Sequence, residues 1–258
     1  MRVAVVQMLS GIDSAANRER VAGVLSSLER GLDLVVLPEG TMHDFGPPGH
    51  DLAAVAEPLD GPFVSLLAEH AQRLRATVVA GMFERSDGLP FNTLVTIGPD
   101  GNLAATYRKI HLYDSFGYRE SERLSPGPLE PVVIDVADLH LGLMTCYDLR
   151  FPELGRALVD AGATAFVVPS AWVAGPGKLD HWRTLVAARA IENTVAVIAA
   201  AQGGERYTGH SLVVDALGSM VEEAGDGDAL LRADLTAAAI SEARDVNPSL
   251  LNRRMPAP

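Results

Sequence analysis

The stretch Leu34-Val35-Val36-Leu37-Pro38-Glu39-Gly40 is a short apolar run that ends at a proline, a carboxylate and a glycine. A run of this length, rich in β-branched residues and closed by turn residues, predicts a buried β-strand. The segment before it, Asp13–Arg30, has apolar residues at helical spacing, and the segment after it, Pro62–Arg75, begins with a proline suited to a first helical turn. A strand between two helices indicates an α/β fold.

The same alternation continues along the whole chain. Further strands are predicted at Val3–Gln7, Thr77–Phe83, Asn92–Ile97, Ala104–Arg108, Val132–Val136, Leu141–Thr145, Ala165–Pro169, Val195–Ala200, Leu212–Val214, Ser219–Glu223 and Leu230–Asp234. Further helices are predicted at Phe151–Ala161, His181–Asn193 and Thr236–Asp245. Many strands with few helices between them indicate a mixed sheet or a pair of sheets covered by helices. No composition break marks a boundary, so we expect one domain over residues 1–258.

Composition excludes several classes of protein. Hydrophobic residues make up 48% of the chain and charged residues 21%, which excludes a disordered polypeptide. The net charge of −12 disfavours a nucleic-acid partner, because such binding needs basic groups to neutralise phosphates. No apolar run approaches the length of a membrane span, and the first residues do not have the pattern of a signal peptide. We therefore expect no membrane partner and a cytoplasmic location.

Two residue types are scarce. The chain has one cysteine, Cys146, which excludes an intrachain disulfide and a cysteine-based metal cluster. Its 21 basic residues include only two lysines, Lys109 and Lys178, while the others are arginines. A position that keeps lysine in an arginine-rich chain is a candidate functional position, although a coding bias toward arginine also explains the pattern.

Three predicted strand ends carry reactive side chains. Glu39 follows the strand at Leu34, Lys109 follows the strand at Ala104, and Cys146 follows the strand at Leu141. Each alone has an ordinary interpretation, namely a solvated charge for Glu39 and Lys109 and a small buried hydrophobe for Cys146. Functional groups of α/β proteins nevertheless collect at the carboxyl ends of strands, where these three could meet.

Together the three side chains fit nucleophilic catalysis. A thiol attacks as a thiolate, so it needs a base or a nearby cation. A carboxylate can take the thiol proton and return it to a leaving amine, and an ammonium can stabilise the anion on an attacked carbonyl oxygen. His111 is close enough in sequence to Lys109 to leave a thiol–imidazole pair open as the alternative.

At these positions the sequence resembles the carbon–nitrogen hydrolase (nitrilase) superfamily. The resemblance extends from Val3 to Arg254. It rests on Leu37-Pro38-Glu39, Tyr107-Arg108-Lys109-Ile110-His111-Leu112, Cys146-Tyr147-Asp148-Leu149-Arg150-Phe151-Pro152-Glu153-Leu154, Pro169-Ser170-Ala171, His181-Trp182, Ala188-Arg189-Ala190-Ile191-Glu192-Asn193 and Gly209-His210-Ser211. It implies a four-layer αββα sandwich, in a homodimer or a higher homo-oligomer, with neither metal nor cofactor.

The resemblance also implies catalytic roles. Cys146 would be the nucleophile, Glu39 the general base and acid, and Lys109 the stabiliser of the oxyanion, with the backbone N–H of Tyr147 as a second donor. The family places another glutamate between the lysine and the cysteine. Glu120 fits that position better than Glu122, which is the competing assignment.

The tripeptide Cys146-Tyr147-Asp148 narrows the range of expected substrates. It resembles the corresponding tripeptide of the amidase branches that cleave ω-amides of small dicarboxylates or deaminated glutathione. The implied reaction hydrolyses a small carboxylate-bearing amide through a cysteine thioester and releases ammonia. The alternatives are a nitrile or N-carbamoyl hydrolase of the same superfamily, a catalytically silent binding protein, and a thiol-based redox sensor.

Three features would shape the pocket. Arg150 either clamps a substrate carboxylate or forms an internal salt bridge with Asp148 or Glu153. Trp172 and Tyr147 are expected at the mouth of the pocket. The segment Asp114–Arg123 is expected to be a lid or a solvated insertion.

Overall fold

Two six-stranded mixed sheets form the centre of the protein. The computed structural model describes residues 1–255. The first sheet has the order β14-β1-β2-β3-β4-β5, and the second has the order β13-β12-β11-β10-β9-β8. The strands of the first sheet are β1 (Arg2–Gln7), β2 (Leu34–Val36), β3 (Thr77–Glu84), β4 (Phe91–Ile97), β5 (Leu103–Arg108) and β14 (Ala229–Asp234). Those of the second are β8 (Val133–Val136), β9 (Leu139–Leu143), β10 (Ala165–Val167), β11 (Ala196–Ala199), β12 (Leu212–Val214) and β13 (Met220–Glu223).

The two sheets repeat one topology. Strands β1, β2 and β3 run parallel, and so do β9, β10 and β11, while the outer strands pair antiparallel in both sheets. Parallel neighbours need a crossover connection, and helices supply it. The helices are α1 (Ser14–Ser27), α2 (Pro62–Leu74), α3 (Pro152–Asp160), α4 (Lys178–Asn193) and α5 (Ala237–Val246).

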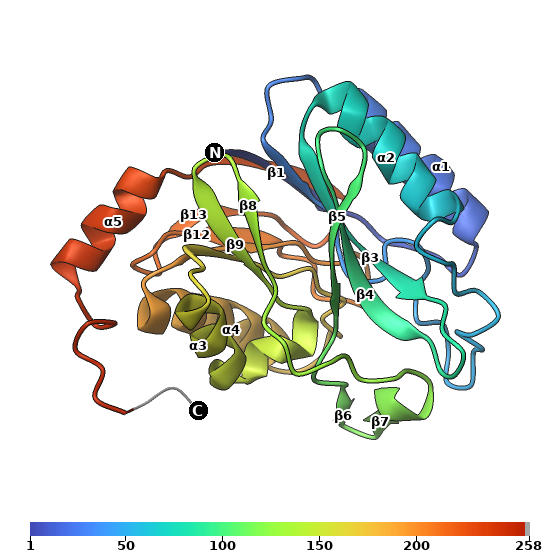
Figure 1. Cartoon of the computed structure of the whole chain (residues 1–258). Coiled ribbons are helices and arrows are strands. Elements are labelled where there is room, and N and C mark those ends of the chain that lie inside the picture. The colour runs from blue at the N-terminus through green and yellow to red at the C-terminus, as the bar shows by residue number, and fades with distance from the viewer. Residues whose placement is uncertain (256–258) are drawn as a thin grey trace.

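Helices cover the outer faces of the sheets. Figure 1 shows α1 and α2 against the first sheet, α3 and α4 against the second, and α5 apart from both pairs. The four layers are the αββα sandwich that the sequence resemblance implied.

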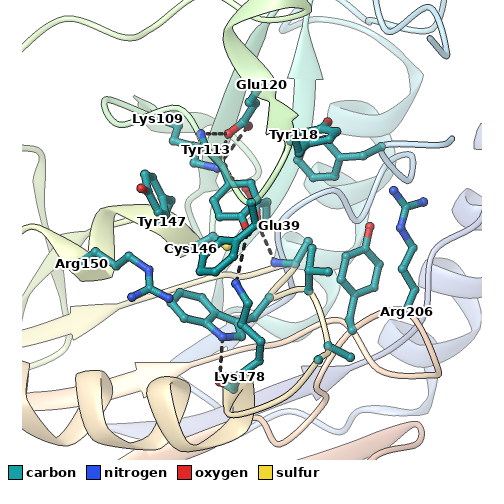
Figure 2. Close-up of a pocket in the computed structure, with 18 of the residues that line it drawn as sticks. Glu39, Lys109, Tyr113, Tyr118, Glu120, Cys146, Tyr147, Arg150, Lys178 and Arg206 are labelled. Atoms are coloured by element: carbon teal, nitrogen blue, oxygen red, sulfur yellow. Dashed lines mark hydrogen bonds and ion pairs between the residues drawn. The ribbon is translucent and has the colours of Figure 1, made fainter. Parts of the chain in front are cut away.

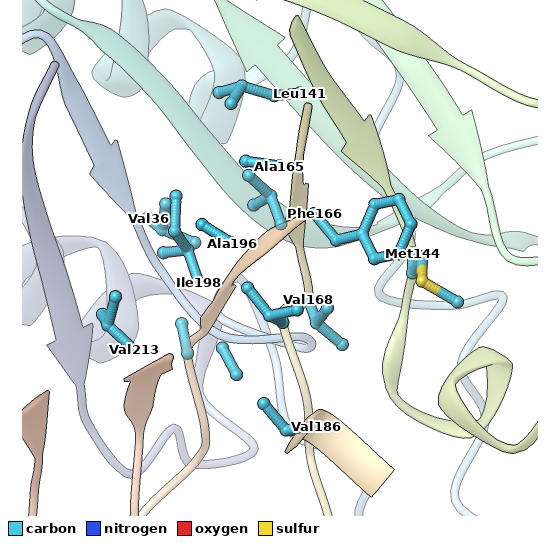
Figure 3. Close-up of a cluster of buried hydrophobic side chains, with 14 of the residues drawn as sticks. Val36, Leu141, Met144, Ala165, Phe166, Val168, Val186, Ala196, Ile198 and Val213 are labelled. Atoms are coloured by element: carbon cyan, nitrogen blue, oxygen red, sulfur yellow. The ribbon is translucent and has the colours of Figure 1, made fainter. Parts of the chain in front are cut away.

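Alternation along the strands explains why both faces of each sheet are covered. Val3 and Val5 of β1 belong to the core between the sheets, whereas Ala4 and Val6 belong to the core under α1 and α2. A strand with a side-chain period of two and no exposed face needs a packed layer on each side. In Figure 3, Val36 of the first sheet lies among residues of the second sheet.

Element boundaries differ from the sequence expectations by a few residues. One difference of three residues is at α4, which we expected to begin at His181 and which begins at Lys178. Gly177 precedes the helix with φ 69°, in the left-handed region that glycine enters freely, so the chain turns into the helix earlier than the apolar pattern suggests. This difference moves Lys178 from a loop to the first turn of a helix.

The segment Asp114–Arg123 also has more order than we expected. It forms a hairpin of β6 (Asp114–Ser115) and β7 (Tyr118–Arg119), followed by a 3₁₀ turn, η1 (Glu120–Glu122). A second 3₁₀ turn, η2 (Cys146–Arg150), follows β9. Within residues 1–255, no helix combines the length and the apolar character that crossing a membrane requires.

One glycine lets the first sheet present Glu39. Gly81 of β3 faces the chain just after β2, and its N–H donates to the carbonyl of Pro38 at 3.1 Å. A Cβ added to Gly81 would lie 2.6 Å from the Cα of Glu39, which is closer than such atoms approach. The residue after β2 therefore reaches its position only because residue 81 has no side chain.

Gly81→Ala should lower the free energy of unfolding by about 1–3 kcal/mol, because the added methyl has no space in this packed region. Urea unfolding measures the change. The matched control is Gly23→Ala in α1, where a Cβ meets nothing within 4 Å. That control should gain about 0.5–1 kcal/mol, as an open helical site does when glycine becomes alanine. Equal effects of the two variants would contradict the close approach at Gly81.

Candidate active site

The three reactive strand ends meet at one cavity between the sheets. Glu39 follows β2, Lys109 follows β5, and Cys146 follows β9. All three line a cavity of about 540 Å³, together with Glu120 of η1. Figure 2 shows them converging from different parts of the chain. The structure therefore brings together Glu39 and Lys109 from the first sheet and Cys146 from the second.

Lys109 is buried between two carboxylates. Its Nζ donates to Oε1 of Glu39 at 3.0 Å and to Oε2 of Glu120 at 2.8 Å. Lys109 is only 2% exposed, and the two glutamates are each 1% exposed. Glu122, the competing assignment, is exposed and pairs instead with Arg119. Glu120 is thus the glutamate that contacts the lysine.

Burial and ion pairing shift the pKa values of Lys109 and Glu120 in opposite directions. Burial alone would lower the pKa of Lys109, but the charges of Glu120 and Glu39 outweigh it and raise that pKa well above its usual range. Burial raises the pKa of Glu120, although the neighbouring Lys109 ammonium opposes this change. The lysine is therefore held as a fixed cation.

Asn92 is part of this network, and the sequence analysis did not identify it. Its Nδ2 donates to Oε1 of Glu39 at 2.7 Å and to Oε1 of Glu120 at 3.1 Å. It lies in β4, and its carbonyl accepts the backbone N–H of Lys109 at 2.8 Å. An asparagine at the start of a predicted strand was the available signal, since a polar side chain that is buried in a sheet needs partners. Asn92 positions both carboxylates and the lysine.

The second Glu39 oxygen is fixed by the other sheet. Oε2 accepts the backbone N–H of Ala171, just after β10, at 2.6 Å. The Glu39 carbonyl accepts Nε2 of Gln202 at 2.9 Å. Contacts to both sheets leave this carboxylate in one orientation toward the cavity.

Cys146 is the first residue of η2, and its backbone is strained. Its φ of 46° lies in the left-handed region, which is rare for a residue with a side chain and occurs at functional sites. Burial raises the pKa of the Cys146 thiol well above its usual range, and the charge of Glu39 adds to the effect. Attack by a thiol with a raised pKa requires that its proton move to a base.

The backbone after the thiol offers a donor. Tyr147 is in the first turn of η2, where N–H groups have no partner within the helix. Among residues 1–255, no hydrogen bond uses the Tyr147 N–H. With Lys109 on the other side of Cys146, the site has two donors for a developing oxyanion.

Asp148 connects the strand end of Lys109 to the strand end of Cys146. This carboxylate is fully buried. It accepts the Tyr107 hydroxyl at 2.6 Å, Nδ1 of His111 at 2.7 Å, the N–H of His111 at 3.0 Å and the N–H of Thr145 at 2.9 Å. Asp148 thus joins Tyr107 and His111, which flank Lys109 in the chain of the first sheet, to Thr145, which precedes Cys146 in the chain of the second sheet.

His111 is held away from the thiol by the same contacts. Its ring is bonded to Asp148 and stacks on Phe151, with the ring centroids 3.7 Å apart. It is not among the residues that line the cavity. The geometry therefore favours the glutamate rather than the imidazole as the partner of Cys146.

Arg150 does not form the internal salt bridge with Asp148 or Glu153 that was one of its two expected roles. Asp148 is saturated by other donors, and no carboxylate of residues 1–255 lies within ion-pair distance of Arg150. Its guanidinium lies 5.0 Å from the ring centroid of Trp172 and 6.0 Å from that of Tyr147. All three residues line the cavity. That interpretation of Arg150 was wrong, because Asp148 is already used to join the two strand ends.

The segment Asp114–Arg123 forms one wall of the cavity. Phe116 and Tyr118 of the hairpin line it, and Glu120 follows directly. The Tyr118 hydroxyl accepts Nη1 of Arg123 at 2.8 Å, which ties the hairpin to the turn. The hairpin thus belongs to the site and is not a solvated insertion.

Other lining residues were not identified from the sequence. Lys178 begins α4 and lies close to the aromatic rings of Tyr113 and Phe116. Arg206 lies at the opposite side with Tyr207, and both contact Asp44. The scarcity of lysine was the one signal available, because both lysines of the chain line this cavity.

Sequence comparison gives a consistent picture. The family model described as carbon-nitrogen hydrolase matches residues 2–245. The chain is 41% identical to the hydrolase Rv0480c of Mycobacterium tuberculosis (strain ATCC 25618 / H37Rv), over 95% of this chain and 92% of the relative. It is 36% identical to the deaminated glutathione amidase of Escherichia coli O157:H7, over 94% of this chain and 93% of the relative.

Comparison of structures agrees. The crystal structure of XC1258 from Xanthomonas campestris, a CN-hydrolase superfamily protein with an arsenic adduct in the active site, matches with a TM-score of 0.89. The two chains are 30% identical, and the match covers 99% of this chain and 97% of that one. The sequence matches and the fold thus agree with one another.

Proposed function

The chain belongs to the carbon–nitrogen hydrolase family, and from this membership we propose that it hydrolyses a small carboxylate-bearing amide through a thioester on Cys146. The observation that carries the proposal is the buried Glu39–Lys109–Glu120 cluster, which lines the same cavity as the Cys146 thiol. The substrate class is that of the deaminated glutathione amidase to which the chain is similar, and of the ω-amides of small dicarboxylates.

The first half of the reaction forms the acyl-enzyme. The sulfur of Cys146 attacks the amide carbon while its proton passes to the Glu39 carboxylate. The Lys109 ammonium and the Tyr147 N–H stabilise the oxyanion, and each such donor contributes about 3–4 kcal/mol in enzymes of this type. Glu39 then gives the proton to the departing nitrogen, the C–N bond breaks, and ammonia leaves.

The second half releases the acid. Glu39 removes a proton from a water molecule, whose oxygen attacks the thioester carbon. The C–S bond breaks, and the proton returns to the sulfur of Cys146. Glu120 keeps Lys109 charged and in place in both halves, while Asn92 donates to both carboxylates and so fixes their positions. Every step uses groups of this chain, an amide and water.

The positive charge of Arg150 in the cavity supports the proposal that the substrate carries a carboxylate. Arg150 has no carboxylate partner within residues 1–255, and its Nε is buried with no hydrogen-bond partner there. Leaving a buried donor unpaired costs free energy, which a bound carboxylate would recover. We also propose a homodimer or a higher homo-oligomer, as the family resemblance implies.

A panel of compounds tests the reaction class. Succinamate, butyramide, a nitrile and an N-carbamoyl amino acid are incubated separately with the protein, and ammonia release is measured. Succinamate should be hydrolysed fastest, and Cys146→Ala should abolish its turnover while circular dichroism stays unchanged. Faster turnover of the nitrile or the carbamoyl compound would assign the protein to another branch of the superfamily. Equal ammonia release by Cys146→Ala and the wild type would contradict the thioester mechanism.

A pair of variants tests the identity of the base. Glu39→Gln should lower kcat/KM by at least about a hundredfold, because an amide can neither take the thiol proton nor return it. His111→Ala should cost less than about tenfold, because its imidazole bonds to Asp148 outside the cavity. Steady-state kinetics on succinamate, with urea unfolding of both variants, gives the answer. A loss in His111→Ala as large as that in Glu39→Gln would favour the thiol–imidazole pair instead.

A further inference from the structure

Lys178 lines the cavity, but the mechanism above does not use it. It is the first residue of α4, and it follows the glycine-rich turn Gly175-Pro176-Gly177. Figure 2 shows its side chain directed from the start of the helix toward Tyr113 and Cys146. The amine therefore points to the space where substrate must lie.

Uncharged groups hold the amine of Lys178. Its Nζ donates to the Tyr113 hydroxyl at 3.2 Å and lies 3.8 Å from the ring centroid of Phe116. Among residues 1–255, no carboxylate lies within ion-pair distance of Lys178. Burial lowers the pKa of Lys178, and the positive charge of Arg150 lowers it further. The structure thus fixes an ammonium in place without neutralising it.

Arg150 is the second cation in the same situation. It lines the same cavity as Lys178, and its buried Nε has no hydrogen-bond partner within residues 1–255. Two like charges without an anion between them repel each other. Arg206 also lines the cavity but differs, because its guanidinium bonds to Asp44 at 2.5 Å and to the carbonyl of Gly46 at 2.7 Å, and Lys109 is paired with its two glutamates. Only Lys178 and Arg150 are left to receive an anion.

We propose that Lys178 is a specificity-determining residue that binds the substrate carboxylate jointly with Arg150. The inference rests on the proposed function and extends it, because it names a residue that selects substrates with an anionic end. A carboxylate has two oxygens with about four lone-pair positions, so it can accept from the ammonium and the guanidinium together.

The first test compares two substrates of similar length. Succinamate has a carboxylate, and butyramide ends in a methyl group. In Lys178→Met, which keeps length and removes charge, the ratio of kcat/KM for succinamate to that for butyramide should fall at least tenfold, a change of about 1.4 kcal/mol. The fall should lie mainly in KM for succinamate. Butyramide hydrolysis should change less than threefold, which shows that the catalytic groups are intact.

Two more variants sharpen the test. Lys178→Arg keeps the charge and should retain most of the preference for succinamate. Lys178→Glu should reduce the preference more than Lys178→Met does, because it repels the carboxylate. A ratio that is the same in the wild type, Lys178→Met and Lys178→Glu would overturn the proposal. A parallel loss on both substrates would also overturn it, since it would assign Lys178 a structural role.

A binding experiment separates this proposal from the proposed function. Succinate is titrated into Cys146→Ala and into the double variant Cys146→Ala/Lys178→Met, with calorimetric detection. The Kd should rise at least tenfold when Lys178 is replaced. If the wild type hydrolyses no amide, the proposed function fails, and the two Kd values still decide the role of Lys178. Equal Kd values, or no succinate binding to Cys146→Ala, would overturn it.

Discussion

The buried ammonium of Lys109 between Glu39 and Glu120 is the interaction on which the rest of the site depends. Removing three charges from water costs several kcal/mol for each, and the cost is offset only when geometry and hydrogen bonding are good. The three side chains come from the ends of β2 and β5 and from η1, so those ends must meet for the charges to be tolerated. Asn92 supplies donors that the lysine alone cannot provide. The cluster therefore fixes Glu39 beside Cys146.

A second constraint brings the thiol to this cluster from the other sheet. Cys146 lies in a left-handed turn after β9, and that turn is attached through Asp148 to the residues on either side of Lys109. A carboxylate that accepts four hydrogen bonds in a buried position is expensive to move, because each bond lost leaves a polar group unpaired. The hydrogen bonds of Asp148 thus fix the position of one sheet relative to the other at the active site, while the apolar core packs the two sheets together.

Much of this arrangement could be predicted from the sequence. Apolar runs of strand length, alternating with amphipathic helices, indicated the α/β layers, and the motifs around Glu39, Lys109 and Cys146 identified the family.

The parts that could not be predicted depend on contacts between distant segments. Asn92 looks like any polar residue of a strand, and its role follows from two carboxylates that arrive from other elements. Arg150 was misjudged for the same reason, because only the fold shows that Asp148 is already saturated. Lys178 was placed in a loop, since its position depends on the left-handed turn at Gly177.

The central claim is that burial and the negative charge of Glu39 together raise the pKa of the Cys146 thiol, and that Glu39 accepts the thiol proton when the sulfur attacks. Cys146 is the only cysteine, so the ultraviolet absorbance of the thiolate, corrected with Cys146→Ala, reports this group alone. Following that absorbance against pH in the wild type and in Glu39→Gln is the most direct measurement. The wild-type midpoint should lie above the usual thiol value of about 8.5, and Glu39→Gln should lower it by about one unit or more, since a neighbouring negative charge is removed. A wild-type midpoint at or below the usual value, or one that Glu39→Gln leaves unchanged, would contradict the account.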